Sequence, residues 1–222
     1  EEEEEIFSYL SSGICKGVGP ATARRIVDRF GADTLDILER SPEKLTLLKG
    51  ITAKRAQEIG ESFRNHMGLR RLMEFLARYE LPPILAMELR RQYGDAALAK
   101  IQENPYLLSG DTCGVEFSVA DQIALGMGLD PEGEERLQAA VSVELSHNEN
   151  NGHVFLPRPK LVTATAQLVQ CEEELVERAL DGLVERGTVV QERVANVEAC
   201  YLRRLWEAET SAALRLGVLL SA

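Results

Sequence analysis

KGVGPATARRI, residues 16–26, joins a glycine-rich turn to the start of a predicted helix. Pro20 suits a first helical turn, where its missing N–H is not needed, and the apolar residues after it follow with helical spacing. Gly17 and Gly19 permit backbone angles closed to other residues and leave no Cβ in the way of an approaching group. Because the free N–H groups and the dipole of a helix start attract anions, this turn is a candidate phosphate site.

The surroundings of the turn favour a nucleic-acid phosphate over a nucleotide phosphate. A nucleotide-binding P-loop requires the pattern GxxxxGK[ST], and a dinucleotide site requires GxGxxG after a strand. Residues 17–19 continue with neither pattern, and no Walker A sequence occurs among the 222 residues. We therefore expect a nucleic-acid backbone as the bound anion, and we expect neither a catalytic residue nor a cofactor site in this chain.

The turn belongs to a unit that occurs twice in the sequence. RFGADTLDILERSPEKL (residues 29–45) matches QYGDAALAKIQENPYLL (residues 92–108) at a constant offset of 63 residues. The match continues on both sides, so residues 14–127 form a duplicated module of about sixty residues. Helical spacing with breaks at glycine and proline predicts roughly four or five short helices in each copy. The matched pairs include Pro20 and Pro83, Gly31 and Gly94, Pro42 and Pro105, and, after one inserted residue, Gly50 and Gly114.

The net charge of −11 argues against a polyanionic partner until its distribution is considered. Residues 6–30 carry four basic side chains against one acidic, and residues 47–79 carry seven against three. The remainder is acidic, beginning with Glu1 to Glu5. Any contact with a polyanion is therefore expected in the first third of the chain.

Cysteine and histidine spacing indicates no metal site and no disulfide framework. The four cysteines form no CxxC pair, and only His147 and His153 lie near each other in sequence. Each cysteine is expected to be a small, buried hydrophobic residue. The chain has no run of eighteen apolar residues and opens on glutamates, so we expect neither a membrane span nor a secretion signal, and a cytoplasmic location. The cysteines are Cys15, Cys113, Cys171 and Cys200.

The pattern changes beyond Pro131, where helical stripes alternate with short strand signals. Leu137, Ala140, Val141 and Leu145 predict one helix, and Leu175, Ala179 and Leu183 predict another. GHVFLP, GTVV and ACYL read as strands, and the final stretch RRLWEAETSAALRLGVLL reads as an amphipathic helix. A helix bundle with a small β wing is typical of winged-helix units, some of which bind DNA. Because residues 134–222 hold fourteen acids against nine bases, a scaffold or partner-contact role is favoured here.

GxGPATARRIV, followed by LLKGI and KRAQEI, resembles tandem helix-hairpin-helix units, which hold DNA phosphates without reading sequence. The ordered set that continues with LRRLMEFLARYELPP, ENPYLL, FSVADQIA and NGHVFLPRPKLV is similar to the N-terminal region of RecD-like ATP-dependent DNA helicases. This is the RecD/TraA family, which includes the alpha subunit of exodeoxyribonuclease V. The resemblance implies a 5′–3′ DNA helicase of repair and recombination, with ATP and Mg²⁺ in a motor domain outside these residues.

The resemblance places the DNA phosphate contacts in the first two turns. Lys49-Gly50-Ile51 fits the pattern in the second turn, although Thr52 replaces a glycine there and is expected to cap the helix. Arg24 and Arg25 are adjacent and therefore point in different directions around their helix. The residues expected to contact DNA are Lys16, Gly17, Val18, Gly19, Thr22, Arg24, Arg25, Lys49, Gly50, Ile51, Thr52, Lys54 and Arg55.

The third and fourth turns are expected to be structural. Leu81-Pro82-Pro83 lacks two of the N–H donors that hold a phosphate, and Cys113-Gly114-Val115-Glu116 places a carboxylate where the anion would lie.

The predicted fold is mainly α, with duplicated helix-hairpin-helix modules followed by a small winged-helix-like α+β unit. The predicted function is non-catalytic, sequence-independent binding of single-stranded or junction DNA. The alternative is a protein-interaction scaffold that docks a helicase motor onto partner subunits. The predicted segments are residues 1–13 (acidic lead-in helix), 14–70 and 71–130 (the two modules), 131–203 (the winged-helix-like unit) and 204–222 (a helix leading towards a motor).

Overall fold

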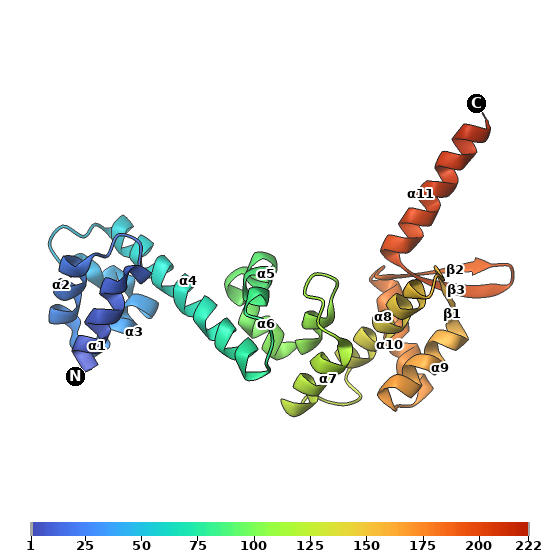
Figure 1. Ribbon diagram of the computed structural model, residues 1–222, viewed down its shortest axis with the longest axis horizontal. Coiled ribbons are helices and arrows are strands. Elements are labelled where there is room, and N and C mark those ends of the chain that lie inside the picture. Colours follow the sequence, from blue (N-terminus) through green and yellow to red (C-terminus); the bar gives the residue numbers. More distant parts are fainter. Residues whose placement is uncertain (1, 222) are drawn as a thin grey trace. The chain divides into compact units, whose positions relative to one another are not determined.

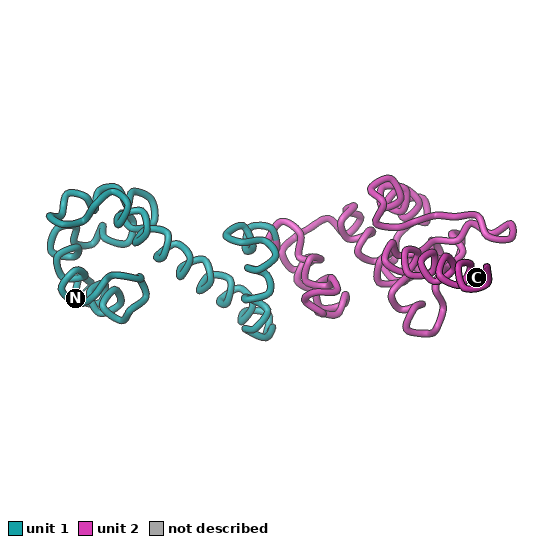
Figure 2. Tube along the Cα trace, turned by 90° about the horizontal axis from the view of Figure 1, so that it is seen from above, with its two compact units in different colours: residues 1–100 teal, residues 101–222 magenta. Residues whose placement is uncertain are grey.

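The computed structural model describes residues 2–221, and the chain divides into two compact units. Unit 1 comprises residues 1–100 and unit 2 comprises residues 101–222 (Figure 2). Both units are mainly helical, and β-structure occurs only as a small sheet in unit 2 among the described residues. The predicted fold class is thereby confirmed, whereas the segment boundaries proposed from the sequence remain predictions.

The first copy of the repeat forms a small helical domain in unit 1 (Figure 1). Its core is formed by the apolar faces of its helices and includes the fully buried Ile26, Leu38 and Phe63. The elements in chain order are α1 (Glu2–Tyr9), the π-helical turn η1 (Leu10–Ile14), α2 (Pro20–Phe30), the 3₁₀ turn η2 (Gly31–Asp33), α3 (Thr34–Arg40), the 3₁₀ turn η3 (Pro42–Leu47) and α4 (Ala53–Arg78).

Helix α4 differs from the short helices expected from the sequence, because it runs without interruption for 26 residues. Gly60 does not break it, since its missing side chain allows contact with Pro42. A Cβ at position 60 would lie 2.6 Å from the Cβ of Pro42. The glycine is therefore explained by close packing of α4 against η3, and the helix continues through it.

The second copy repeats the elements of the first in the same order. The 3₁₀ turns η2 and η4 both begin at a glycine with positive φ, +53° at Gly31 and +58° at Gly94. These glycines follow the ends of α2 and α5, where the sequence predicted them. Duplication of the helical module is therefore confirmed by the structure. The elements are α5 (Ile84–Tyr93), η4 (Gly94–Ala96), α6 (Ala97–Glu103), η5 (Pro105–Ser109) and α7 (Phe117–Gly126).

The C-terminal part of unit 2 has the element order of a winged helix. Three helices pack against a three-stranded antiparallel sheet with the strand order β1-β3-β2. Ala195 and Asn196, both at positive φ, form the turn of the β2-β3 hairpin. The elements are α8 (Glu134–Asn150), β1 (Leu156–Pro157), α9 (Arg158–Val169), α10 (Glu173–Glu185), β2 (Val189–Val194), β3 (Val197–Leu202) and α11 (Arg203–Leu220).

The helices and strands proposed beyond Pro131 are all present, and their apolar stripes are buried except for Leu175, which is partly exposed. Helix α9 was not foreseen. Its threonines, Thr163 and Thr165, have low helix propensity, and burial of apolar residues such as Leu161 and Val162 stabilises it. Helix α11 is predicted correctly as a helix but has no buried residue. No helix within residues 2–221 combines the length and the apolar character needed to cross a bilayer.

A polar network joins η5 and α7 to the winged-helix part within unit 2. Asp121 on α7 accepts hydrogen bonds from the Tyr106 hydroxyl (2.7 Å) and from Nε of Arg136 on α8 (2.8 Å). Nη1 of Arg136 also donates to the carbonyl oxygens of Pro131 (2.8 Å) and Val169 (2.9 Å). Burial opposes ionisation of Asp121, but the hydrogen bonds from Arg136 and Tyr106 lower its pKa. The network therefore contains a charged and fully hydrogen-bonded pair.

Candidate nucleic-acid interface

Four turns join the paired helices of the repeat, and each has one residue with positive φ at the same position. These residues are Gly17 (+83°), Gly50 (+88°), Glu80 (+56°) and Gly114 (+65°). Only the third turn uses a residue with a side chain there, which costs about 1–2 kcal/mol relative to glycine. The four turns are therefore related in backbone shape, and they differ in what they present to a ligand.

Turn 1 (residues 15–19) combines a buried anchor with an open helix start. Val18 is buried, and its N–H donates to the Cys15 carbonyl at 3.1 Å, so Val18 holds the turn from inside. Gly19 is the N-cap of α2 and supplies no side-chain cap. The N–H groups of Ala21 and Thr22, in the first turn of α2, find no acceptor within the described residues. They are available to an anion.

Space in front of turn 1 is also open. A Cβ placed at Gly17 or Gly19 would meet no atom within 4 Å. Lys16 is exposed, and its backbone N–H donates to Ser62 Oγ on α4 at 3.0 Å. Burial raises the pKa of the Cys15 thiol to about 11, so this neighbour stays protonated and uncharged. Turn 1 thus presents backbone donors and one lysine on an unobstructed surface.

Turn 2 (residues 48–52) has the same plan with one substitution. Ile51 is buried and donates its N–H to Leu48 O at 3.1 Å, as Val18 does in turn 1. Thr52 Oγ1 accepts from the N–H of Arg55 at 3.2 Å, which confirms the predicted cap. This bond satisfies one donor that turn 1 leaves open, but Lys54 remains exposed beside the helix start.

Two side-chain hydrogen bonds join turn 1 and turn 2. Nη2 of Arg25, on α2, donates to Lys49 O at 2.6 Å. Nη2 of Arg55, on α4, donates to Gly17 O at 2.9 Å. The sequence predicted that both arginines contribute charge at the site, but it gave no sign that each reaches the opposite turn. The two turns are therefore adjacent on one face of unit 1.

Unpaired cations surround this pair of turns. Within residues 2–221, Lys16, Lys49 and Lys54 form no ion pair, and neither do Arg25 and Arg55. A surface cation without a carboxylate partner keeps its full attraction for phosphate. We call Lys16, Lys49, Lys54 and the backbone of turns 1 and 2 the turn face.

Arg24 behaves differently from the other expected contact residues. Its guanidinium forms two hydrogen bonds with the Glu4 carboxylate, at 2.8 and 3.1 Å, and lies over the Phe7 ring at 3.8 Å from the centroid. The hydrogen bond from Arg24 lowers the pKa of Glu4. Arg24 and Arg25 thus point to different neighbours, as their adjacency on a helix predicted. The acidic start of α1 therefore partly neutralises the basic block of residues 6–30. The sequence did not reveal this pairing.

The second basic block is also smaller than its composition indicated. Arg71 pairs with Glu39 at 2.7 Å, and Arg70 pairs with Glu74 at 2.9 Å. Arg64 donates to the backbone carbonyl of Glu39. Arg70 and Arg71 are thus neutralised along α4, whereas Lys49, Lys54 and Arg55, near its start, form no ion pair within residues 2–221.

Turns 3 and 4 present no lysine or arginine of their own. In turn 3 the glycine position is Glu80, and Pro83 is the N-cap of α5. In turn 4 the N-cap of α7 is Glu116, with its carboxylate at the helix start. A carboxylate at the site of the expected anion repels phosphate, so the second module lacks the features of the turn face.

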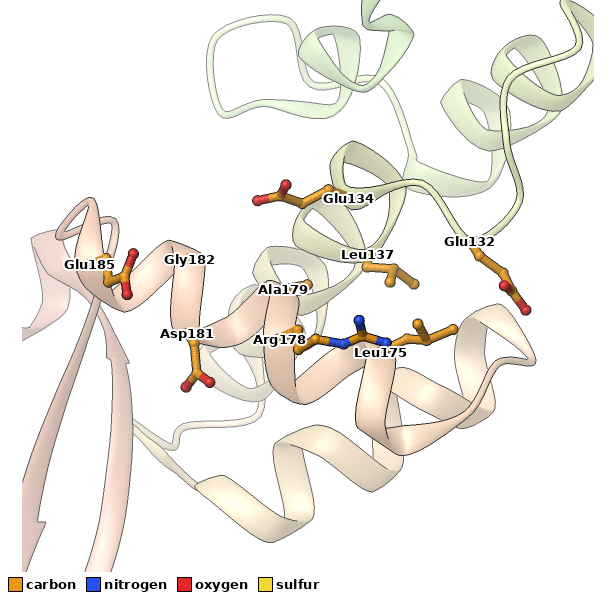
Figure 3. Close-up of a pocket in the computed structure, with 9 residues that line it drawn as sticks. All are labelled: Glu132, Glu134, Leu137, Leu175, Arg178, Ala179, Asp181, Gly182 and Glu185. Carbon is orange, nitrogen blue, oxygen red and sulfur yellow. The ribbon is translucent and has the colours of Figure 1, made fainter.

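The winged-helix part carries acidic groups where a DNA-binding helix would need cations. A cavity of about 450 Å³ lies between α8 and α10. Figure 3 shows its side chains, with Leu137, Leu175 and Ala179 between the two helices and Arg178 as its one cation. Its acidic members are Glu132, Glu134, Asp181 and Glu185. This surface is electrostatically unsuited to a polyanion.

Two family models and one known protein match this chain. A family model described as "ATP-dependent RecD2 DNA helicase HHH domain" matches residues 65–155, and one described as "SAM-like Helix-hairpin-helix tandem" matches residues 7–65. The chain is similar to an ATP-dependent RecD2 DNA helicase of Deinococcus radiodurans, with 27% identity over 192 residues. That alignment covers 86% of this chain and 26% of the relative, so the chain spans about a quarter of the relative's length.

Proposed function

We propose, because the chain matches the N-terminal helix-hairpin-helix region of a RecD-like helicase, that it binds DNA through the phosphate backbone without sequence specificity. The interface consists of the residues of turns 1 and 2 with the helix starts that follow them, residues 16–25 and 49–55. No base-reading element is required, since backbone N–H groups and lysines contact phosphates of any sequence. The preferred DNA is a single strand or a strand junction.

One observation carries this proposal. Turns 1 and 2 are adjacent, open and bordered by unpaired lysines, in a chain whose net charge is −11. In a strongly acidic protein, lysines left unneutralised around backbone donors favour an anionic ligand. Turns 3 and 4 serve as a comparison within the same chain. They have the same backbone shape but carry carboxylates and lack the unpaired lysines.

The chain's wider role follows from the same match. We propose that the whole protein is an ATP-dependent 5′–3′ DNA helicase of the cytoplasm that acts in repair and recombination. ATP and Mg²⁺ would belong to its motor domain, which lies outside these residues. The present residues would then act as a non-catalytic DNA-binding region that holds the motor domain on the DNA strand.

A second candidate function is a protein-interaction scaffold. The acidic winged-helix part and helix α11, which has no buried residue, favour it, since neither suits DNA. In that case unit 1 would show little affinity for DNA, and unit 2 would dock a motor onto partner subunits.

Salt dependence of DNA binding distinguishes these functions. We expect the chain to bind fluorescein-labelled forked DNA, with an affinity that falls steeply between about 50 and 200 mM salt. Lys16→Gln and Lys54→Gln should each weaken binding and reduce the slope of log K against log salt by about 0.7 to 0.9, because each removes one phosphate contact. Lys160→Gln, which removes an exposed lysine of α9, is the matched control. Binding that is insensitive to salt, or equal losses in all three variants, would contradict the proposal.

A further inference from the structure

Arg25 and Arg55 form a reciprocal pair. Arg25 lies on the helix that follows turn 1 but bonds to a carbonyl of turn 2, and Arg55 lies on the helix that follows turn 2 but bonds to a carbonyl of turn 1. Each helix therefore holds the turn that belongs to the other. A third bond, from Lys16 N–H to Ser62 Oγ, ties turn 1 to α4 on the same side.

The two bonds hold one peptide in each turn, Lys49–Gly50 in turn 2 and Gly17–Val18 in turn 1, where the Val18 N–H also donates to Cys15 O. In a trans peptide the C=O and N–H groups point in opposite directions, and no cis peptide occurs among the described residues. When Arg25 holds the carbonyl of Lys49, the N–H of the same peptide, on Gly50, is turned away from Arg25. That N–H finds no acceptor within residues 2–221. Its orientation therefore depends on the guanidinium of the neighbouring helix.

The chemistry of the two bonds suits a fixing role. Each joins a guanidinium to a neutral carbonyl, and hydrogen bonds to charged groups are stronger than those between neutral partners. Arg55 is only partly exposed, and neither arginine forms an ion pair within the described residues. The planar guanidinium reaches the carbonyl in a geometry that a lysine ammonium, at the end of a side chain one bond shorter and more flexible, does not reproduce.

We propose that Arg25 and Arg55 are positioning residues that fix turns 1 and 2 as one phosphate-binding unit. The charge that meets the phosphates is supplied by Lys16, Lys49 and Lys54. Without the arginines turn 2 loses its bond to α2, and turn 1 keeps only the bond from Lys16 N–H to Ser62 on α4. The turns would then bind phosphates more independently and more weakly. This inference rests on the proposed DNA binding and assigns a different role to two residues of that interface.

Charge-conserving substitutions test the inference in the whole chain. In Arg25→Lys and Arg55→Lys the charge is kept and the bond to the opposite turn is lost. We expect each variant to bind the fluorescein-labelled forked DNA about tenfold more weakly than the parent chain. Arg29→Lys is the matched control, because Arg29 is exposed on α2 and makes no bond to either turn. It should bind as the parent does, and circular dichroism should show that all variants are folded.

Amide signals in ¹H–¹⁵N spectra distinguish positioning from direct contact. Arg25→Lys should abolish the DNA-induced shift at Gly50, in turn 2, and leave that of Gly19, in turn 1. Arg55→Lys should do the reverse. A residue that touches phosphate itself would affect its own turn first, so this crossed pattern is specific to the proposed role.

The outcomes separate the inference from the function on which it rests. If Arg25→Lys and Arg55→Lys bind as tightly as Arg29→Lys, or change the signals of their own turns, the positioning role is wrong. Loss of affinity in Lys16→Gln and Lys54→Gln would still support the DNA interface in that case. If the parent chain shows no salt-sensitive affinity, the proposed function fails and the inference fails with it.

Discussion

Gly17 and Gly19 lie two residues apart in the same turn, but they are glycines for different reasons. Gly17 has φ +83°, where a side chain is strained, whereas Gly19 has φ −88°, which any residue adopts. Neither position is crowded, since a Cβ at either would meet nothing within 4 Å. Backbone conformation thus explains Gly17, whereas neither backbone conformation nor crowding requires a glycine at Gly19.

This difference predicts separate effects of alanine at the two positions. Gly17→Ala should lower the free energy of unfolding by about 1–2 kcal/mol, because the residue is held at positive φ. Gly19→Ala should leave the free energy of unfolding within about 0.5 kcal/mol of the parent value. Both should weaken DNA binding, since each Cβ stands where a phosphate approaches. Urea unfolding and fluorescence anisotropy measure the two quantities. Unchanged DNA affinity in Gly19→Ala would show that the open space serves no ligand.

At the scale of helices and strands, the sequence predicted much of the structure because local signals dominate there. Apolar stripes located α8 and α10, and prolines and glycines located the helix ends. The prediction of short helices was wrong for α4, since Gly60 is explained by its contact with Pro42, which lies far from it in sequence.

The candidate site was predictable in its turns and not in its side-chain bonds. Glycine spacing locates turns 1 and 2, because positive φ leaves a clear residue signature. The bonds of Arg25 and Arg55 to the opposite turn, and that of Arg24 to Glu4, join residues 20 to 38 positions apart. An arginine has the same pattern in sequence whether it binds a phosphate, a carboxylate or a carbonyl, so its partner is known only once the helices are packed.

The network of Tyr106, Asp121 and Arg136 predicts how unit 2 responds to substitution. Arg136→Met should cost about 3–5 kcal/mol of unfolding free energy, because it leaves the Asp121 carboxylate buried without its partner. Tyr106→Phe should cost about 1–2 kcal/mol, since one hydrogen bond is lost. The double variant Arg136→Met/Asp121→Leu should recover much of the first loss. Urea unfolding checks each value, and a double variant no more stable than Arg136→Met would contradict the argument.

Acid should weaken the same network. The pKa of Asp121 in the folded chain lies below its ordinary value of 3.8. The stabilisation from its ionised form is therefore fully present above that value and is lost as the pH falls through the lower, folded pKa. In Asp121→Asn this contribution to the acid dependence of unfolding should be absent. Urea unfolding at neutral pH and below about pH 4 measures it.

At the scale of the whole molecule, the question is whether net charge or local pairing governs DNA affinity. Glu2 and Glu4 are both exposed on α1, and of these two glutamates only Glu4 pairs with Arg24. Glu4→Gln and Glu2→Gln change the net charge equally. We expect Glu4→Gln to raise DNA affinity several-fold by releasing Arg24, and Glu2→Gln to have a smaller effect. Titration of both variants with forked DNA at low salt provides the test, and equal gains would show that net charge alone matters.

Helix α4 connects the end of turn 2 to the start of turn 3 without interruption. Its 26 residues span about 39 Å at about 1.5 Å per residue. Lengthening such a helix requires breaking its backbone hydrogen bonds. A pulling force at one end therefore meets a stiff element and not a flexible linker. Load applied at the second module is therefore transmitted along α4 to the turns proposed to hold DNA. If the protein works against a moving strand, α4 is the part that carries the tension.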